Sequence, residues 1–469
     1  MPGQGKKKMG SLAGRHRRNM RILFASVVVV VLAMAAVLVV AVTAHNASAG
    51  RGELTIAPEP APITAAPQVT PVPDDAPMPT AQGIAAAVGP AAANPDLGKF
   101  SGTVADAVTG QVLWSVNPQT PMTPASTTKV LTAGSALLAL PSDRRVTTKV
   151  VQGATPGEIV LVAGGDPTLT AKPVGENGYY PGAAHISQLV DQIRNAGVQV
   201  TSIVVDTSIY SGDTMAQGWF PTDVGAGFIT PTEPIMIDGG RADPLVDESP
   251  RSATPALDAG RTLAGALGVA PSAVTSGVAA PGAATVASVQ SAPLRDRLRQ
   301  MMEHSDNVLA EAIGREVAMN AGAEASFDGA VATIGQTLTA AGFDLSGFTL
   351  HDASGLSVDD RIAPHTLDQV LTAAAGDGNP ALRPMLDYLP VAGATGSLSD
   401  RYASGNRTGA GWVRAKTGTL STASALAGYV VDQNGRVLTF ALMSNDRPPE
   451  VSRPALDALA AALRTCGCQ

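Results

Sequence analysis

A serine and a lysine three residues apart, followed by a long apolar run, place the strongest constraint on this chain. Ser126 and Lys129 are one helical turn apart and therefore share one face of a helix. Thr123 and Pro124 precede them as an expected N-cap and first-turn proline. The residues behind them are mostly apolar as far as Leu140, which predicts a buried helix. Ser126 should then lie in the first turn of a core helix, near the positive end of its dipole.

This pair has a chemical interpretation. A lysine in an apolar pocket loses proton affinity and can accept the proton of a serine hydroxyl. Ser126 would be the nucleophile and Lys129 its base. A single S-x-x-K pattern is also typical of a solvated helix face, so the interpretation depends on partners elsewhere in the chain.

Composition narrows the classes of function. The chain has 469 residues, enough for two or more domains, and its 45% hydrophobic residues can supply a sizeable core. Residues 1–21 contain seven Lys and Arg residues and no acid, so the rest of the chain has a formal charge of −14 against a total of −7. An acidic body with only 4% aromatic residues argues against a nucleic-acid-binding protein.

The two cysteines, Cys466 and Cys468, both lie in the C-terminal tail, residues 465–469. No Cys/His cluster has zinc spacing, so we expect neither a metal nor a cofactor. Two interpretations of the tail stay open, free thiols or a small local disulfide.

The N-terminal residues predict a location outside the cytoplasm. After the basic segment 1–21, expected to stay cytoplasmic, residues 22–44 are apolar except for Ser26 and Thr43. A run of this length can span a bilayer, which favours a retained anchor over a cleaved signal ending at Ala49. Either interpretation places the following residues outside the cytoplasm, membrane-anchored or secreted. Residues 45–95 are rich in Pro and Ala and predict an extended spacer.

The remaining sequence predicts a mixed α/β fold. A turn at Thr109 and Gly110 favours a hairpin of strands 101–107 and 111–116. Further strands are expected at 146–151, 158–162, 202–206, 411–416, 423–431 and 437–443. Helices are expected at 183–196, 254–267, 291–304, from 306 onward, and at 325–342, 364–374 and 452–463.

Two more motifs supply the partners of Ser126. Ser305, Asp306 and Asn307 lie between two predicted helices, with Ser291 as the expected cap of the first. The second motif, at the end of a predicted strand, is Lys416, Thr417, Gly418 and Thr419. Each motif alone also fits an ordinary cap or turn. Their occurrence in this order and in these structural contexts favours one joint site.

On these motifs the sequence resembles the D-alanyl-D-alanine carboxypeptidase/endopeptidase family of class C low-molecular-mass penicillin-binding proteins, peptidase S13 type. The resemblance extends over about residues 96–464. It is also carried by Gly164–Leu169, His304–Asn307 with Glu311 downstream, Asp352–Ser357 and Leu389–Gly393.

The resemblance implies a penicillin-binding/β-lactamase-like transpeptidase fold. An antiparallel sheet is sandwiched by helices, with a large domain inserted between S-x-x-K and S-x-N. Residues 96–141 and 291–464 would form the catalytic domain, and residues 142–290 the insertion. The insertion is shorter than is usual in the family, which implies that its smaller nested domain is reduced or missing.

The same resemblance implies the roles of the site residues. Ser126 would attack the carbonyl of the penultimate D-Ala of a peptidoglycan stem peptide, with Lys129 as base and Ser305 as proton relay. β-Lactams would acylate Ser126, and the amides of Ser126 and Thr419 would form the oxyanion hole. Substrate-binding residues would be Asn307, Lys416, Thr417, Gly418 and Thr419, with Ser354, Gly355 and Leu356 lining a side-chain pocket.

The sequence disfavours several alternative classes of enzyme. No Glu-x-x-Leu-Asn or Gly-x-Ser-x-Gly pattern occurs, which disfavours a class A β-lactamase and an α/β-hydrolase. His351 and Asp352 could belong to a catalytic triad, but a turn is favoured, and Asp359 and Asp360 are expected in a solvated loop. The remaining alternative is a catalytically silent wall-binding or scaffold protein of the same fold. The intact polar motifs favour an enzyme.

Overall fold

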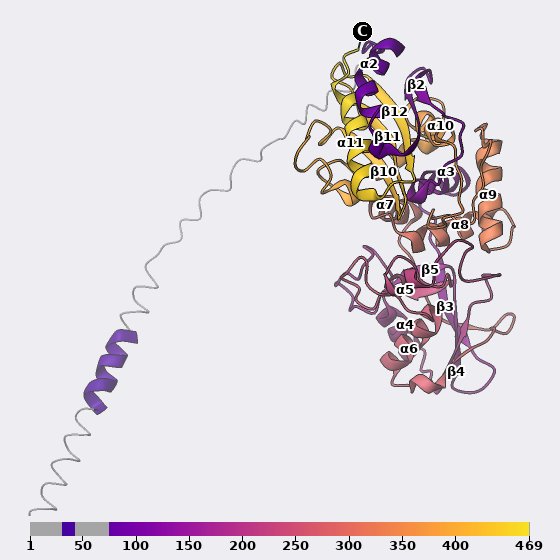
Figure 1. Cartoon of the computed structure of the whole chain (residues 1–469). Coiled ribbons are helices and arrows are strands. Elements are labelled where there is room, and N and C mark those ends of the chain that lie inside the picture. Colours follow the sequence, from indigo (N-terminus) through magenta and orange to yellow (C-terminus); the bar gives the residue numbers. More distant parts are fainter. Residues whose placement is uncertain (1–30, 43–74, 469) are drawn as a thin grey trace, which may run out of the picture. The chain divides into compact units, whose positions relative to one another are not determined.

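The computed structural model describes residues 31–42 and 75–468 (Figure 1). Residues 31–42 form a helix with exposed apolar side chains. Segment 1–21, the cleavage site at Ala49, residues 22–30 and 43–44 of the predicted membrane segment, and residues 45–74 of the predicted spacer lie outside the described residues. Within the two described ranges, no helix combines the length and the hydropathy needed to cross a bilayer.

A five-stranded antiparallel sheet organises the part of the chain that carries the motifs. Its strand order is β10-β11-β12-β1-β2, so the first strands of the folded region pair with the last. The bounds are β1 Lys99–Asp106, β2 Val112–Val116, β10 Val413–Leu420, β11 Ala423–Val431 and β12 Val437–Asn445. The predicted hairpins β1–β2 and β11–β12 are both present.

Alternating side chains of this sheet enter two separate hydrophobic cores. Leu426 and Phe440 point to one face, which α2 (Ala81–Ala92) and α11 (Pro449–Thr465) cover. Ala425 and Ala441 point to the other face, where small side chains leave room for a layer of helices. That layer comprises α3 Lys129–Ala139, α7 Leu294–Glu303, α8 Asn307–Asn320, α9 Phe327–Ala340 and α10 Pro364–Ala375.

A second five-stranded sheet lies, in sequence, between Lys129 and Ser305. Its order is β8-β6-β4-β3-β9, with parallel and antiparallel pairs, and two helices cover it around a core of its own. The strands are β3 Thr147–Gln152, β4 Glu158–Val162, β6 Ser202–Asp206, β8 Val274–Ser276 and β9 Thr285–Gln290, and the helices are α4 Ile186–Asn195 and α6 Pro255–Leu267. A short pair and a short helix complete this region, β5 Asp166–Leu169, β7 Ile235–Ile237 and α5 Thr222–Gly225.

The predicted spacer is wrong at its C-terminal end, because α2 lies within it. Thr80 caps this helix by accepting the amide of Gly83, and Ile84 and Val88 are buried one turn apart. The amide of Thr80 also donates to the carbonyl of Cys468 at 2.8 Å. The tail is thus packed on the fold, and the structure joins Cys466 and Cys468 in a disulfide.

Two predicted element ends are also wrong. The hydroxyl of Ser291 accepts the amide of Val146, and α7 begins only after Pro293, so Ser291 caps no helix. Strand β10 continues through Leu420, which places Lys416 in the middle of the strand.

The short 3-10 helices are η1 Pro95–Leu97, η2 Ala125–Thr128, η3 Asp238–Gly240, η4 Pro271–Ala273, η5 Pro380–Tyr388 and η6 Gly396–Leu398.

Candidate active site

Ser126 lies in the 3-10 turn η2, directly before α3. The predicted cap at Thr123 is wrong, since its amide donates to Oδ1 of Asn445 and no side chain caps the turn. Ala125 has a φ of 47°, a left-handed conformation that non-glycine residues rarely adopt. This reversal turns the chain so that Ser126 is half-buried while its neighbours Ala125 and Thr127 are fully buried.

Lys129 is fully buried beside Ser126. Its Nζ donates to Oγ of Ser126 at 2.9 Å, to Oδ1 of Asn307 at 2.6 Å and to the carbonyl of Ser354 at 2.7 Å. Burial lowers the pKa of Lys129 from 10.5 to about 8, although the charges of four nearby carboxyl groups act to raise it. At pH 7 about one tenth of Lys129 is therefore neutral, within hydrogen-bond distance of a hydroxyl.

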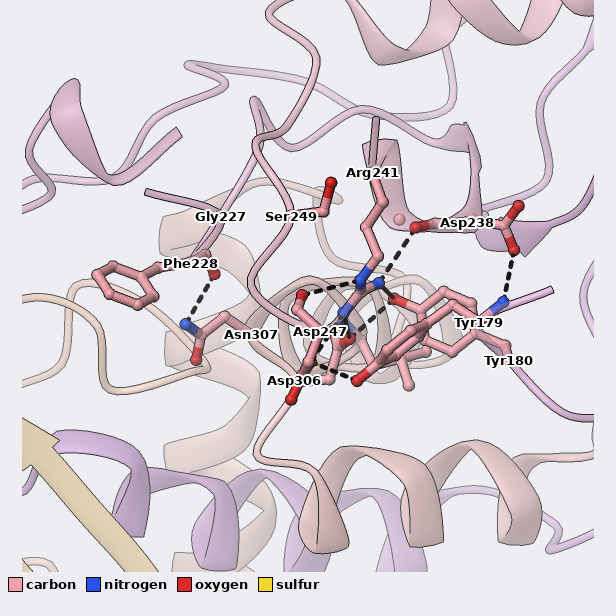
Figure 2. A network of polar contacts seen from close by, with 12 residues as sticks. Tyr179, Tyr180, Gly227, Phe228, Asp238, Arg241, Asp247, Ser249, Asp306 and Asn307 are labelled. Carbon is pink, nitrogen blue, oxygen red and sulfur yellow. Dashed lines mark hydrogen bonds and ion pairs between the residues drawn. The ribbon is translucent and has the colours of Figure 1, made fainter. Parts of the chain in front are cut away.

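Ser305, Asp306 and Asn307 join α7 to α8. Ser305 has a φ of 60°, which is strained for a residue with a side chain. Asp306 caps α8, with Oδ1 accepting the amide of Leu309 at 2.8 Å. Asn307, the first residue of α8, turns Oδ1 to Lys129, and its Nδ2 donates to the carbonyl of Phe228 at 3.0 Å (Figure 2).

Lys416 is a second buried lysine in the site. Its Nζ donates to Oγ of Ser305 at 2.8 Å and to the carbonyl of Thr417 at 2.9 Å. Burial, followed by the charge of Lys129, lowers the pKa of Lys416 well below its usual range. The three motifs thus meet in one place, with one serine held by each lysine.

Strand β10 lies at the edge of the sheet and passes directly over the Ser126 turn. A Cβ atom at Gly418 would lie 2.5 Å from the carbonyl oxygen of Pro124, so this approach requires glycine. The amide of Ala415 donates outward, to the carbonyl of Pro390 at 3.1 Å. Since backbone direction alternates along a strand, the amides of Thr417 and Thr419 point to the same open side.

Sequence reasoning missed Ser397 as a site residue. Its hydroxyl lies 2.7 Å from Oγ1 of Thr417, within hydrogen-bond distance. Ser397 belongs to the short 3-10 helix η6, and its sequence context contains no pattern that indicates chemistry. Phe228 was also missed, because its contact with Asn307 uses a backbone carbonyl, which any residue type can supply.

The loop 352–357 supports the Ser126 turn from behind. Ser354 and Gly355 are buried, and a Cβ at Gly355 would lie 2.0 Å from the carbonyl oxygen of Ala125. Ser354 is buried and Gly355 has no side chain, so neither residue exposes a side chain toward the predicted pocket. Leu356 is partly exposed and packs beside Trp219.

Two carboxyl groups behind this loop have structural contacts. Asp352 accepts three backbone amides of its own loop and Nε1 of Trp219, which fits the predicted turn rather than a triad. Asp360 is fully buried, so the predicted solvated loop is wrong there. It accepts the amide of His351 at 2.7 Å, and burial and Asp352 raise its pKa well above the usual range.

Glu311 is buried one turn into α8 and accepts the amide of Ala353 at 3.1 Å. It also pairs with Arg315 at 3.3 Å. Burial and the charge of Asp352 raise the pKa of Glu311 to about 7. Across residues 31–42 and 75–468, no group of three or more His, Cys, Asp or Glu side chains could hold a metal ion.

Comparison with known proteins assigns this arrangement to a family. The model of the D-Ala-D-Ala carboxypeptidase 3 (S13) family matches residues 84–250 and 245–466. The chain belongs to this family. It is 52% identical over 460 residues to carboxypeptidase DacB of Mycolicibacterium smegmatis, covering 97% of this chain and 99% of that protein. It is 51% identical over 416 residues to a carboxypeptidase of Mycobacterium tuberculosis, covering 88% and 90%.

Solved structures agree on the fold. Penicillin binding protein 4 (dacB) from Haemophilus influenzae matches with a TM-score of 0.66 at 22% identity, covering 82% of this chain and 98% of that one. The predicted family and the predicted penicillin-binding fold are therefore confirmed.

Proposed function

We propose that this S13-family chain is a serine-type D-Ala-D-Ala carboxypeptidase that trims peptidoglycan stem peptides through an acyl-enzyme on Ser126. The observation that carries the proposal is the buried Nζ of Lys129, 2.9 Å from Oγ of Ser126, with its pKa lowered to about 8. The carboxypeptidase names of the relatives at 52% and 51% identity support the reaction class.

Acylation begins with proton transfer from Ser126 to neutral Lys129. Oγ of Ser126 then attacks the carbonyl carbon of the penultimate D-Ala, and a tetrahedral oxyanion forms. The outward amide of Thr419 and the amide of Ser126 stabilise this oxyanion, because donors fixed in advance cost no reorganisation during reaction. Asn307 holds Lys129 in place through its Oδ1 at 2.6 Å.

The departing D-alanine needs a proton on its nitrogen. Ser305 can relay the proton that Lys129 took from Ser126, and the hydrogen bond from Nζ of Lys416 at 2.8 Å holds its hydroxyl in place while Lys416 keeps its charge. Lys416 also offers the charge for the substrate's terminal carboxylate, with the hydroxyls of Thr417 and Thr419 as further donors. Water then hydrolyses the ester on Ser126 and restores the free enzyme.

The chief alternative is a silent protein that keeps the fold and only binds peptidoglycan or a partner protein. Labelling with a fluorescent penicillin, followed by mass spectrometry, separates the two proposals. The H. influenzae protein has been solved in complex with a β-lactam, which supports this class of probe. We expect an adduct on Ser126 that is absent in Ser126→Ala. An unlabelled but well-folded wild-type protein would rule out the enzyme.

We further propose that the enzyme also cleaves cross-linked peptides, as an endopeptidase. The shared site chemistry supports this proposal, because both bonds are amides that join the carbonyl of a D-Ala residue to the nitrogen of an amino acid. Release of free D-alanine from a pentapeptide, compared with cleavage of a cross-linked dimer, measures the two activities. Absence of dimer cleavage under conditions of rapid D-alanine release would restrict the enzyme to carboxypeptidase action.

The proposed substrate lies outside the cytoplasmic membrane, so we propose that the folded region is extracytoplasmic. Residues 22–44 would anchor it to the membrane, or a signal cleaved after Ala49 would release it. Cell fractionation combined with N-terminal sequencing of the mature protein tests this location. A soluble cytoplasmic protein with an intact N-terminus would contradict it.

A further inference from the structure

The inserted region, residues 142–290, contacts the S-D-N motif directly. Arg241 follows the 3-10 helix η3 in the inserted region, and its guanidinium lies between Asp306 and two tyrosines (Figure 2). Nη2 of Arg241 pairs with Oδ2 of Asp306 at 3.1 Å, and both side chains are only 1% exposed. Tyr180 donates its hydroxyl to the same carboxylate oxygen at 2.9 Å.

Arg241 is itself fixed by several contacts. Its Nη1 donates to the hydroxyl of Tyr180 at 3.0 Å, and its guanidinium stacks on the ring of Tyr179. Its Nε donates to the carbonyl of Asp247 at 3.1 Å, and the hydroxyl of Tyr179 donates to the carboxylate of Asp247. A guanidinium held on all sides can hold its partner carboxylate in one orientation.

A second contact comes from the same inserted region. Phe228 exposes 42% of its surface, but its backbone carbonyl accepts Nδ2 of Asn307. Gly227 before it has a φ of 85°, and a Cβ there would lie 2.5 Å from the backbone of Glu248. Arg251 fixes this turn by donating Nε to the carbonyl of Gly227 at 2.9 Å. Asn307 is thereby held with its Oδ1 toward Lys129.

We propose that Arg241, Tyr180 and the carbonyl of Phe228 are positioning groups for the catalytic S-D-N motif, so that the inserted region completes the active site. This inference rests on the proposed function, because it assigns these groups a part in acylation of Ser126.

The backbone of the motif supplies the physical reason. Ser305 is strained at a φ of 60°, and such a conformation persists only where neighbouring contacts hold it. Asp306 follows Ser305 directly, and Arg241, Tyr180 and the amide of Leu309 fix its carboxylate. Relaxation of Asp306 would move Ser305 on one side and Asn307 on the other. The two residues contact different lysines of the site.

The same contacts control charge near Lys129. Burial would raise the pKa of Asp306, but the charges of Arg241 and Arg251, with Leu309 and Tyr180 as donors, lower it to about 2. Asp306 is one of the carboxylates that favour protonated Lys129. Without Arg241 that charge would be less compensated, and Lys129 would give up its proton only at higher pH. The other charged groups facing Lys129 are Glu311, Asp352, Asp360 and Lys416.

The test measures acylation of Ser126 by fluorescent penicillin in full-length variants, at temperatures where circular dichroism shows each to be folded. Arg241→Gln should slow acylation by about 10- to 100-fold, as expected for sub-ångström displacement of catalytic groups. It should also move the rising part of the pH profile to higher pH. Tyr180→Phe should slow acylation by a smaller factor without moving the profile, because it removes no charge. Arg241→Lys should restore part of the rate.

A matched control is Arg297→Gln. Arg297 forms an equally buried ion pair with Glu316, at 2.6 Å, and touches no motif residue. It should lower thermal stability but leave the acylation rate and its pH profile unchanged. Gly227→Ala provides a test of the Phe228 contact that alters no buried charge, and should also slow acylation.

The outcomes separate this inference from the proposed function. Wild-type protein that forms no adduct would overturn the proposed function and this inference with it. Reactive wild type with equally reactive, folded Arg241→Gln and Tyr180→Phe variants would overturn only the positioning role. Slowing of Arg297→Gln to the same extent would also overturn it, because the effect would then follow general destabilisation. If Arg241→Gln does not fold, Tyr180→Phe and Gly227→Ala decide the question.

Discussion

The lowered pKa of Lys129 makes acylation of Ser126 dependent on pH in a predictable way. With a pKa of about 8, about one tenth of Lys129 is neutral at pH 7 and about nine tenths at pH 9. If neutral Lys129 is the base, the acylation rate should rise about tenfold over these two pH units. An exposed lysine near 10.5 would be almost fully charged throughout and would give a much lower rate that keeps rising above pH 9.

The assay measures the first-order rate of adduct formation at saturating fluorescent penicillin, from about pH 6 to about pH 9.5. Saturation matters because Lys416 is also buried with a lowered pKa, and the bound carboxylate of the penicillin keeps it charged. Rapid acid quenching followed by gel fluorescence gives the rate at each pH. Circular dichroism at each pH provides the control that the protein stays folded.

A rate that is constant between pH 6 and pH 9 would refute Lys129 as the titrating base, as would a rate that falls. Asn307→Asp sharpens the test, because it places a carboxylate where Oδ1 now lies 2.6 Å from Nζ of Lys129. At an effective dielectric constant of about 20, charges about 4 Å apart interact by about 4 kcal/mol, so protonated Lys129 would be strongly favoured. Acylation at pH 8 should then fall by at least about 100-fold.

Three further perturbations have outcomes that follow from the contacts. Gly355→Ala should abolish acylation and lower the melting temperature, because its Cβ would lie 2.0 Å from the carbonyl oxygen of Ala125; unchanged values for both would show that the turn can move freely. The raised pKa of Glu311, about 7, gives a stability contribution that is complete below the unfolded value of 4.5 and is lost as the pH rises through about 7. Urea denaturation should therefore show the wild type losing about 2 kcal/mol relative to Glu311→Gln between pH 5 and pH 8, and parallel curves would contradict this. Arg436→Gln leaves buried Asp106 without its ion-pair partner and should cost about 3 kcal/mol in the same assay, whereas a loss below about 1 kcal/mol would show an ion pair of little net value.

The motif residues could be predicted because their chemistry depends on residue type and order. Ser126 with Lys129, Ser305 with Asn307, and Lys416 retain their identity wherever the chain takes them. The long helices and the β11–β12 hairpin were also predictable, since their apolar spacing and turn residues are local signals. These local signals cover the scaffold and most of the residues that meet at the site.

The features that sequence reasoning missed depend on contacts between distant segments. The left-handed conformation of Ala125, where the first turn of a regular helix was expected, depends on close packing against Gly355 and Gly418. Asp360 looks like a surface residue in the sequence, but in the structure its side chain is fully buried and accepts the amide of His351. Helix α2 has the Pro/Ala composition of the spacer before it, and only burial against α11 distinguishes the two.

The two buried lysines give the site a requirement that neither motif shows alone. Catalysis needs Lys129 neutral and Lys416 charged, yet burial disfavours charge on both, and the charge of Lys129 further lowers the pKa of Lys416. A substrate carboxylate beside Lys416 would favour the charged form of Lys416. The charge on Lys416 then disfavours protonation of Lys129. Binding of a terminal carboxylate therefore prepares the base as well as orienting the peptide. By this reasoning, a peptide that ends in an amide should lose acylation rate at saturation, and not only affinity.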